Sequence, residues 1–436
     1  MALLKVVSGE KPREIAARVL QRRASGHFVE GLLEQELAQA RISAADRGLC
    51  QELVYGVVRW RATLDWLIGR KTGDRTQKPL LQDLLRLGLY QIFWLDRIPN
   101  HAAVFETVAM AKRSGLGQQS GFVNALLRSY LREFDATKEQ LASLKSSQPA
   151  LGYSHPEWLV ARWQTRWGAE KTSQLLSWNN TPAKTYARVN TLKTDPGKLL
   201  AQWHEENVEY DFVRADWFEE GLIFELKTHP SLSRLPSFNQ GLFYVQDPST
   251  LLSVHALAPA PGDRILDLCA APGGKTTYVA QRIGNQGELW AHDTIPDRIK
   301  LIEENCARLG VTCAKAVVSS GLETFQAASF DRVLVDAPCS NTGVMRRRID
   351  LRWRVRAEEI ARLRRTQLGL ICQAALLLKY RGRLVYSTCS LEPEENRELI
   401  QTFLGEEPTF MVESERELLP FNDQVDGAYV VSLKKG

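Results

Sequence analysis

The sequence lacks the cysteine patterns and the long apolar runs that mark secreted, metal-binding or membrane proteins. Its seven cysteines are scattered and odd in number, without a CxxC pair or a His/Cys cluster of zinc-ligand spacing. We therefore expect reduced thiols, no structural metal and a cytoplasmic location. The longest nearly apolar run, 368–378, is far shorter than the ~20 residues of a membrane span. The opening MALLKVVSGEKPR is not typical of a signal peptide, so no membrane association is expected.

The length and the charge distribution indicate several domains and a polyanionic partner. A chain of 436 residues is too long for one hydrophobic core, so two or three domains are expected. Residues 1–145 contain 22 Lys and Arg against 15 Asp and Glu, whereas the remainder is close to neutral. A basic N-terminal part is a weak indication of nucleic-acid binding. Nothing in the sequence requires more than a monomer.

The hydrophobic pattern changes twice along the chain and predicts three domains. Residues 1–145 have helical periodicity, with helices predicted at 28–40, 44–69, 79–95, 101–113 and 119–134. Residues 146–245 combine connector helices, rich in tryptophan, with short alternating segments typical of a small α+β subdomain. Strands and helices alternate over 246–436, which predicts a parallel, doubly wound α/β domain. The expected fold is thus an all-α bundle, a small α+β subdomain and a Rossmann-like domain.

A glycine-rich turn follows the first strand of the α/β domain and predicts a nucleoside site. It lacks the P-loop pattern, because Cys269 stands where the first glycine is required, and it also lacks G-x-G-x-x-G. A P-loop ATPase is therefore disfavoured. Asp293 ends the next strand, where a carboxylate can accept hydrogen bonds from ribose hydroxyls or merely cap a helix. A nucleoside without pyrophosphate fits best, and S-adenosylmethionine is the common cofactor of that kind.

Two thiols follow two other strands of the same domain. Cys339 comes after an apolar run and Asp336, and Cys389 ends a second run. The alternative interpretation is that Cys339 is a small buried hydrophobe and Asp336 a turn cap. Together, two thiols at one sheet edge favour covalent chemistry on an electrophile such as cytosine, whose carbon 5 becomes nucleophilic once a thiolate adds to carbon 6. Asp336 would steady the ring, and Lys275 would add positive charge.

Three motifs, CAAPGGKT (269–276), VDAPCSNTG (335–343) and YSTCSLEPEEN (386–396), resemble those of the RNA (cytosine-5-)methyltransferases of the bacterial RsmB (Sun/Fmu) type. LRLGLYQIFWLDRIPNHAAV (85–104) and GFVNALLR (121–128) are similar to the NusB-like RNA-binding domain of that family. FYVQDPSTLL (243–252) is similar to the segment that introduces its methyltransferase domain. The resemblance covers nearly the whole chain and implies 16S ribosomal RNA as the partner.

The resemblance implies a role for each matching residue. Cys389 would be the nucleophile, Cys339 would assist breakdown of the covalent intermediate, and Asp336 and Lys275 would complete the catalytic group. The cofactor contacts implied are Cys269, Ala270, Ala271, Pro272, Gly273, Gly274, Lys275, Asp293, Ser320 and Asp336.

The chain departs from the family pattern at two places. Ser319-Ser320-Gly321 stands where the family has an acidic residue near the cofactor's adenine, and Ile349 replaces a usual proline. The first departure affects one cofactor contact, and the second affects only the shape of a loop.

An arginine-rich stretch lies just beyond the Cys339 loop. Residues 346–365 hold nine arginines against three acids. The later arginines, Arg362, Arg364 and Arg365, are most simply interpreted as a helix face exposed to solvent. We predict that Arg346, Arg347 and Arg348 contact RNA phosphates, so binding should weaken steeply with salt. The predicted activity is S-adenosylmethionine-dependent 5-methylcytosine formation in 16S ribosomal RNA. The alternatives are the same chemistry on transfer RNA and a non-catalytic RNA-binding assembly factor.

Overall fold

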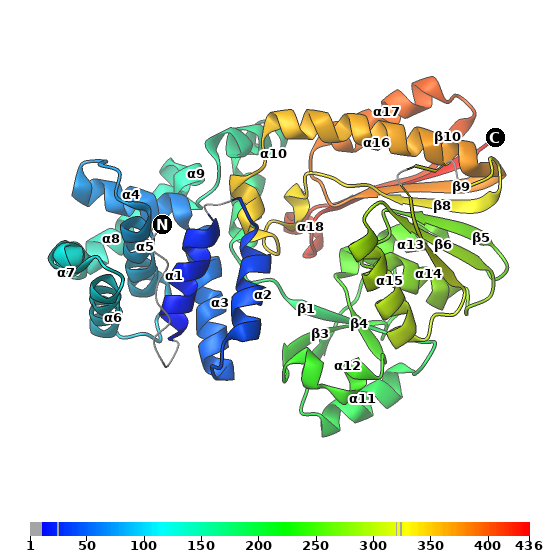
Figure 1. The fold of residues 1–436 in the computed structure, drawn as a ribbon. Helices are drawn as coiled ribbons and strands as arrows, with labels where there is room; N and C mark the ends of the chain where they lie inside the picture. The colour runs from blue at the N-terminus through cyan, green and yellow to red at the C-terminus, as the bar shows by residue number, and fades with distance from the viewer. Residues whose placement is uncertain (1–10, 24–25, 320, 323–324) are drawn as a thin grey trace. The chain divides into compact units, whose positions relative to one another are not determined.

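The computed structural model describes residues 11–23, 26–319, 321–322 and 325–436 and divides the chain into two compact units (Figure 1). Unit 1 comprises Met1–Thr181 together with Met345–Arg354, and unit 2 comprises Pro182–Val344 together with Val355–Gly436. The sequence predicts domain boundaries after residues 145 and 245. The two compact units do not divide at these positions, and the boundaries stay predictions. Within the described ranges, no helix is long and apolar enough to cross a membrane, and no group of metal-ligating side chains is assembled.

Unit 1 is helical, as predicted. Its helices are α1 (Pro12–Arg23), α2 (Val29–Gln39), α3 (Ala44–Arg59), α4 (Arg61–Thr72), α5 (Pro79–Trp94), α6 (Asn100–Arg113), α7 (Ser120–Arg132), α8 (Phe134–Ser147), α9 (Pro149–Gly152) and α10 (Glu157–Asn179). The single helix predicted over 44–69 is wrong, because the chain turns at Trp60 and starts a second helix there. Apolar residues at helical spacing bury one continuous core, including Leu53, Leu84 and Leu127.

A later segment of the chain completes unit 1. The 3-10 helix η5 (Ile349–Trp353) lies in the segment 345–354, which we call the inserted segment. Its Arg352 is fully buried and donates to Asn180 Oδ1 at 2.7 Å and to the carbonyl of Asn179 at 2.8 Å. Its Asp350, also fully buried, pairs with Arg23 at 2.5 Å. Buried ionic groups with defined partners fix this segment within unit 1.

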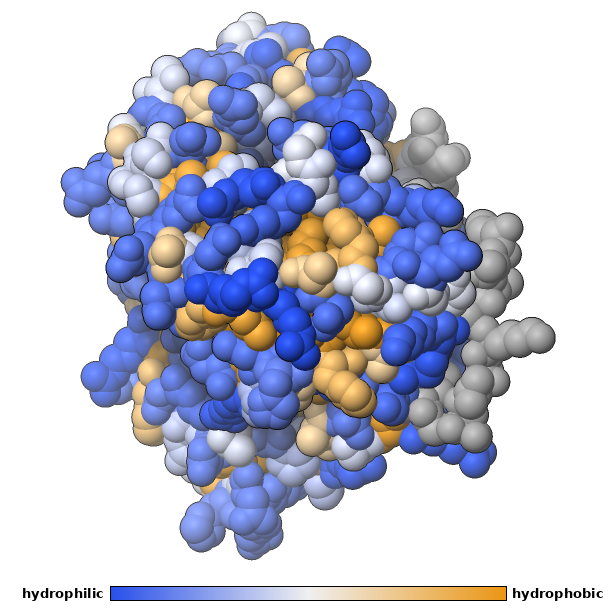
Figure 2. Space-filling view, turned by 90° about the vertical axis from the view of Figure 1, so that its left-hand side faces the viewer, coloured by the Kyte–Doolittle hydropathy of each residue, from blue (hydrophilic) through white to orange (hydrophobic). Residues whose placement is uncertain are grey.

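The surface of unit 1 mixes cationic and aromatic side chains. Figure 2, which shows the side that carries α7 in Figure 1, is mainly hydrophilic with small apolar patches. Phe105 on α6 is 69% exposed, and Phe122 on α7 is 37% exposed. Arg128 and Arg132 on α7 are also exposed. Cations and aromatic rings are therefore both exposed at the surface of unit 1.

Unit 2 begins with a small antiparallel sheet, which matches the predicted α+β subdomain. Its strands are β1 (Thr185–Val189), β2 (Glu209–Phe212), β3 (Ile223–Thr228) and β4 (Phe243–Val245), in the order β2-β3-β1-β4. Helices α11 (Pro196–Glu205) and α12 (Pro236–Asn239) accompany it. Trp203 of α11 is fully buried against Phe224 and Phe243 of the sheet. Arg188 on β1 donates to the carbonyl of Gly274 at 2.9 Å, which joins this sheet to the start of the helix Gly274–Arg282.

The larger sheet of unit 2 has seven strands in the order β10-β11-β9-β8-β5-β6-β7. Its strands are β5 (Arg264–Leu268), β6 (Glu288–Asp293), β7 (Ala314–Val318), β8 (Phe330–Asp336), β9 (Leu378–Thr388), β10 (Phe410–Leu418) and β11 (Ala428–Lys435). The five strands from β9 to β7 are parallel, as predicted, while β10 and β11 pair antiparallel at one edge. The sheet is therefore mixed rather than wholly parallel.

Helices cover both faces of this sheet, which gives the doubly wound architecture. In Figure 1, α16 (Ala357–Leu377) and α17 (Arg397–Glu406) lie on one face. The other face carries α13 (Leu251–Leu257), α14 (Gly274–Arg282) and α15 (Pro296–Leu309), and the short α18 (Pro420–Asp423) precedes β11. The central strands are buried from both sides, which explains their near-continuous apolar sequences. Ligand sites in such sheets lie at the carboxyl ends of the strands.

Candidate active site

The parallel pairing of β8 and β9 brings the two thiol-bearing loops together. Asp336, the last residue of β8, is in register with Ser387 of β9, and Ser387 Oγ donates to Asp336 Oδ1 at 3.0 Å. Beyond this pair, Pro338 has no N–H to continue the strand, so the chain leaves the sheet before Cys339. Cys389 directly follows the end of β9. Both thiols therefore reach the same edge of the sheet, as the sequence predicts.

The two thiols are in contact with each other and with Asn341. Cys339 Sγ and Cys389 Sγ lie 3.3 Å apart, and the Cys389 thiol donates to Asn341 Oδ1 at 3.1 Å. Asn341 Nδ2 donates to the carbonyl of Cys339 at 2.5 Å, and its φ of 57° is a left-handed conformation that asparagine tolerates. The hydrogen bond with Cys389, followed by burial, raises the pKa of Cys339 well above its usual range. Cys339 therefore keeps its proton at neutral pH.

An ion pair lies beside the thiols. Lys275, in the first turn of α14, donates to Asp336 Oδ2 at 2.6 Å. Burial alone would lower the pKa of Lys275, but the charge and the hydrogen bond of Asp336 outweigh burial and raise it. Lys275 is therefore a cation at neutral pH. The side chain of Asp336 is 34% exposed, so it can still meet a ligand.

The predicted cofactor loop, residues 269–274, connects β5 to α14. Gly273 has a φ of 99°, and a Cβ at this position would lie 3.3 Å from Ile302 Cα, so a side chain is disfavoured there. The loop delivers backbone N–H groups at the N-terminus of α14, a site suited to polar ligand groups. Pro272 is exposed, whereas Ala270 and Ala271 are buried.

Asp293 ends β6 beside this loop, where the sequence places it. Its carboxylate accepts from the amides of Ala271 at 3.4 Å and Ile295 at 3.2 Å, and Arg298 lies 3.3 Å away. These contacts are long, and a carboxylate has about four acceptor positions. Asp293 thus caps the turn and keeps capacity for ribose hydroxyls.

A buried acceptor without a partner lies under the same loop. Asp267 in β5 is fully buried, and its Oδ2 accepts from Thr276 Oγ1 at 2.6 Å. Its Oδ1 has no hydrogen-bond partner within the described part of the chain. Burial raises the pKa of Asp267 to about 7. S-adenosylmethionine carries an ammonium group and ribose hydroxyls, which are donors, so the acids at 267 and 293 and the loop fit this cofactor.

The arginines predicted to contact RNA do not share one environment. Arg346 is 2% exposed and its guanidinium lies 3.9 Å from the centre of the Trp178 ring, and its phosphate contact stays a prediction. The cationic guanidinium group of Arg346 is buried against the indole ring instead of lying in solvent. Arg347 is half-buried and Arg348 is exposed, and their phosphate contacts stay predictions. Ser320 lies outside the described residues.

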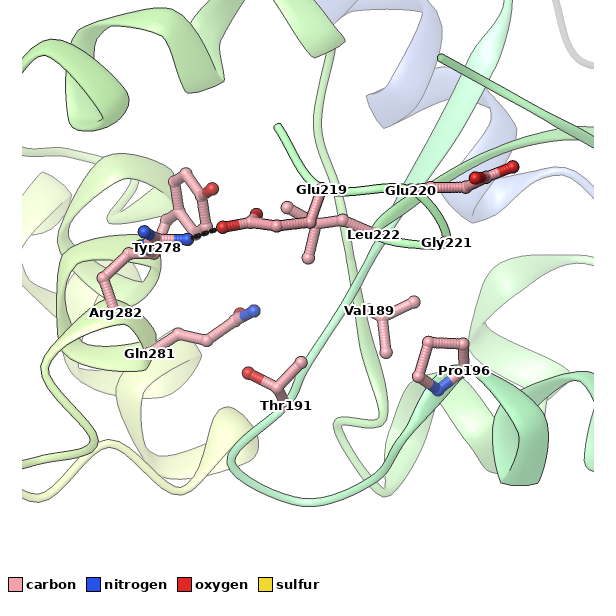
Figure 3. Close-up of a pocket in the computed structure, with 10 residues that line it drawn as sticks. All are labelled: Val189, Thr191, Pro196, Glu219, Glu220, Gly221, Leu222, Tyr278, Gln281 and Arg282. Atoms are coloured by element: carbon pink, nitrogen blue, oxygen red, sulfur yellow. Dashed lines mark hydrogen bonds and ion pairs between the residues drawn. The ribbon is translucent and has the colours of Figure 1, made fainter. Parts of the chain in front are cut away.

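A pocket of about 290 Å³ lies elsewhere in unit 2 (Figure 3). Its lining comes from β1, the segment before β3 and the last turns of α14, with Gln281 pointing into the space and Glu219 paired with Arg282. None of its ten lining residues is a predicted site residue. It is therefore separate from the thiol site.

Four polar residues of the site were not singled out from the sequence. Asn341 and Ser387 lie within the quoted motifs, two residues from a cysteine each, and that spacing is the signal that could have found them. Glu395 also lies within a quoted motif, but both Asp267 and Glu395 are carboxyls whose complete burial the local sequence does not indicate. No local pattern distinguishes such acids from surface ones.

Comparison with protein-family models gives three matches along the chain. A model described as 16S rRNA methyltransferase RsmB/F matches residues 254–434, and a NusB family model matches residues 10–132. A third, the ferredoxin-like domain of RsmF/B-like methyltransferases, matches residues 155–229.

Full-length relatives and solved structures are also similar. A probable ribosomal RNA small subunit methyltransferase B of Bacillus subtilis (strain 168) is 34% identical over 97% of this chain and 98% of its own. A ribosomal RNA small subunit methyltransferase B of Klebsiella pneumoniae is 35% identical over 91% and 92%. The crystal structure of PH0851 has a TM-score of 0.79 and 25% identity, covering 99% of this chain and 100% of its own. A methyltransferase homolog protein from Pyrococcus horikoshii has a TM-score of 0.58 and 29% identity, covering 66% and 97%.

Proposed function

This chain belongs to the 16S rRNA methyltransferase RsmB/F family, and we propose that it transfers a methyl group from S-adenosylmethionine to carbon 5 of a cytosine in 16S ribosomal RNA. The observation that carries the proposal is the contact between Cys339 and Cys389, 3.3 Å apart. The ion pair of Lys275 with Asp336 lies beside them. Two thiols, an acid and a cation at one sheet edge are the groups that covalent catalysis on cytosine requires.

Cys389 is the nucleophile of the proposed reaction. Its thiolate adds to carbon 6 of the base, and the electron pair of the 5,6 double bond makes carbon 5 nucleophilic. When bound, S-adenosylmethionine supplies an electrophilic methyl group on its sulfonium.

Cys339 acts after the methyl group has moved. Once Cys389 is bonded to carbon 6, its sulfur no longer carries a charge that opposes ionisation of Cys339, and the Cys339 proton passes to solvent. The Cys339 thiolate then takes the proton from carbon 5, and the bond between Cys389 and carbon 6 breaks. The electron pair of the carbon 5–hydrogen bond restores the 5,6 double bond, and the thiolate of Cys389 leaves.

Asp336 steadies the base during both steps. Addition at carbon 6 places electron density on nitrogen 3. The proton that the Cys389 thiol releases passes to the Asp336 carboxylate, which then gives it to nitrogen 3 and accepts from the exocyclic amine. Ser387 and Lys275 hold the carboxyl group in place from two sides. The acids Asp267 and Asp293 and the loop 269–274 hold the cofactor.

We expect the substrate to be a base unstacked from RNA. The Cys339 thiol is buried, with 8% exposure, and a base held in a stacked pair would not reach it. The basic, NusB-like part of unit 1 binds the RNA, together with Arg348, an exposed cation of the inserted segment. We expect a monomer that acts in the cytoplasm.

The direct test incubates the protein with labelled S-adenosylmethionine and unmodified 16S ribosomal RNA, and then maps the label. We expect label at carbon 5 of a cytosine. Transfer RNA serves as the competing substrate. Label in transfer RNA alone would contradict the proposed substrate and indicate the alternative, the same chemistry on transfer RNA. Label in neither RNA would favour a non-catalytic assembly factor.

Variants of the two thiols separate their roles. We expect Cys389→Ser to abolish methyl transfer, because a hydroxyl does not add to carbon 6 at a useful rate. We expect Cys339→Ser to leave protein trapped on RNA as an adduct that survives a denaturing gel, because product release stalls. An adduct that accumulates with Cys389→Ser instead would reverse the two assignments.

A further inference from the structure

One fully buried carboxylate beside the thiols has no part in the proposed reaction. Glu395 ends the 3-10 helix η6 (Pro393–Glu395), which follows the Cys389 loop, and its relative exposure is 0%. A buried carboxylate is costly unless several hydrogen bonds stabilise it. The partners of Glu395 therefore indicate what this acid does.

Glu395 accepts hydrogen bonds from both thiol-bearing loops. Ser340, the residue after Cys339, donates its backbone N–H to Glu395 Oε1 at 2.8 Å and its hydroxyl to Oε2. Ser390, the residue after Cys389, donates its hydroxyl to Oε2 at 2.5 Å. The two serine hydroxyls lie 3.0 Å apart. One carboxylate thus bridges the residues that directly follow the two cysteines.

The surroundings of this bridge are closed and polar. Gln367 of α16 donates its Nε2 to Glu395 Oε1 at 2.9 Å and to the carbonyl of Pro338 at 3.0 Å. The hydroxyl of Tyr386 donates to the backbone carbonyl of Glu395 at 2.7 Å. Ser340, Ser390 and Gln367 are all buried, so removal of the carboxylate takes away the buried acceptor that their donors share. Its loss would leave several donors unpaired in both loops.

We infer that Glu395 is a positioning residue that sets the separation of the Cys339 and Cys389 thiols by holding the serine after each of them. This inference rests on the proposed function for its catalytic consequence. Glu395 does not touch the base. It acts through Ser340 and Ser390, which fix where the two loops leave the sheet.

The separation matters because the two thiols act in succession on adjacent carbons of one ring. Cys389 bonds to carbon 6, and Cys339 must then reach the hydrogen on carbon 5. A displacement of about 1 Å in such an arrangement can cost roughly 100-fold in rate. Two loops from separate strands need a common anchor to keep that precision.

Thiol–disulfide exchange measures the separation without RNA or cofactor. In glutathione buffers, the disulfide of oxidised glutathione breaks, the Cys339–Cys389 bond forms, and the two thiol hydrogens pass to two reduced glutathione molecules. The equilibrium gives the effective molarity of the pair, which mass spectrometry of the cross-linked peptides quantifies. We expect Glu395→Ala to lower this effective molarity at least tenfold, and Glu395→Gln to lower it less. The control Glu398→Gln, an exposed acid on α17, should match the wild type.

Two further variants cover the case in which Glu395→Ala does not fold, which circular dichroism reports. Ser340→Ala and Ser390→Ala each remove one end of the bridge, and each should lower the effective molarity several-fold. Values within twofold of the wild type for every folded variant would overturn the inference. A lowered value in a protein that methylates no RNA would reject the proposed function while leaving the positioning role intact.

A kinetic measurement separates positioning from a general structural role. In Glu395→Ala, Cys389 can still attack, but Cys339 is misplaced for release. We expect the ratio of trapped adduct to released product to rise above the wild-type ratio in a single turnover. A variant that is only less stable would lower both in proportion, and that result would also contradict the inference.

Discussion

Asp267 makes the stability of the protein depend on pH. Its pKa is about 7 in the folded state because of burial, against about 3.9 in an unfolded chain. Between these values the folded protein keeps a proton that the unfolded chain releases. The free energy of unfolding should therefore fall as pH rises from about 4 to about 7, by up to about 4 kcal/mol.

Asp267→Asn removes this titration. We expect the stability of the variant relative to the wild type to rise over the same pH window, because an amide stays neutral. Urea unfolding at several pH values measures the difference. Asp297→Asn on α15, where the acid is exposed, should show no such trend. A constant difference between Asp267→Asn and wild type across the window would contradict the assignment.

Asp336, the last residue of β8, is the site residue whose carboxyl group should matter most to the rate of methyl transfer. We expect Asp336→Asn to lower the rate of methyl transfer about 100- to 10,000-fold, because the amide does not supply a proton to nitrogen 3. Transfer of labelled methyl groups to RNA measures this rate. The matched control is Asp331→Asn at the other end of β8, whose acid pairs with Lys379 at 2.7 Å. Equal rates for the two variants would remove Asp336 from the mechanism.

At the scale of elements, the backbones of three loops meet at Gly343, namely the loop after β8, the loop after β9 and the loop before β11. A Cβ there would lie 2.7 Å from the carbonyl oxygen of Gly427 and 2.8 Å from that of Cys389. The N–H of Gly343 also donates to the carbonyl of Cys389 at 2.9 Å. This close approach holds the loop after β8 against the loop after β9.

Gly343→Ala should push these loops apart. We expect a loss of about 1–3 kcal/mol in stability and at least about a 100-fold loss in methyl transfer. Gly369→Ala provides the control, because this glycine is exposed in α16 with no atom within 4 Å of a new Cβ. That change should raise stability by about 0.5–1 kcal/mol. Thermal unfolding and labelled methyl transfer report both quantities.

The elements that the sequence predicts best are those whose signal is local. The apolar runs before Asp293, Asp336 and Cys389 identify buried strands and place these residues at one edge of the sheet. The antiparallel strand β10 was not predicted, because its sequence FMVESEREL exposes most of its side chains at the sheet edge. The pairing of Cys339 with Cys389 follows from the order of β8 and β9, which depends on long-range packing.

The burial of Arg346 and Arg352 shows where such prediction stops. Arginine in a charged stretch usually lies at the surface. The acceptors of Arg352 are backbone groups and Asn180, more than a hundred positions away in sequence. The indole over which Arg346 lies belongs to Trp178. No local sequence pattern predicts that Arg346 and Arg352 bind partners so far away in the sequence.

At the scale of the whole molecule, the inserted segment should carry much of the stability of unit 1. Arg352→Ala leaves several buried acceptors without a donor and opens a cavity. We expect it to cost about 3 kcal/mol or more, with faster amide hydrogen exchange in α3 and α10. Arg362→Ala, an exposed arginine on α16, should leave exchange in unit 1 unchanged. Equal protection in both variants would show that the inserted segment is dispensable for unit 1.

The membership of residues 345–354 in unit 1 has a consequence for synthesis on the ribosome. Residue 181 emerges first, and most of unit 2 must be translated before residue 345 follows. At 5–20 residues per second, the wait is roughly 10 to 30 s. During that time the nascent helices lack Asp350 and Arg352, so Arg23 and the backbone carbonyls of α3 and α10 stay without their buried partners. An N-terminal domain that is translated first thus reaches its final form only after its successor is largely made.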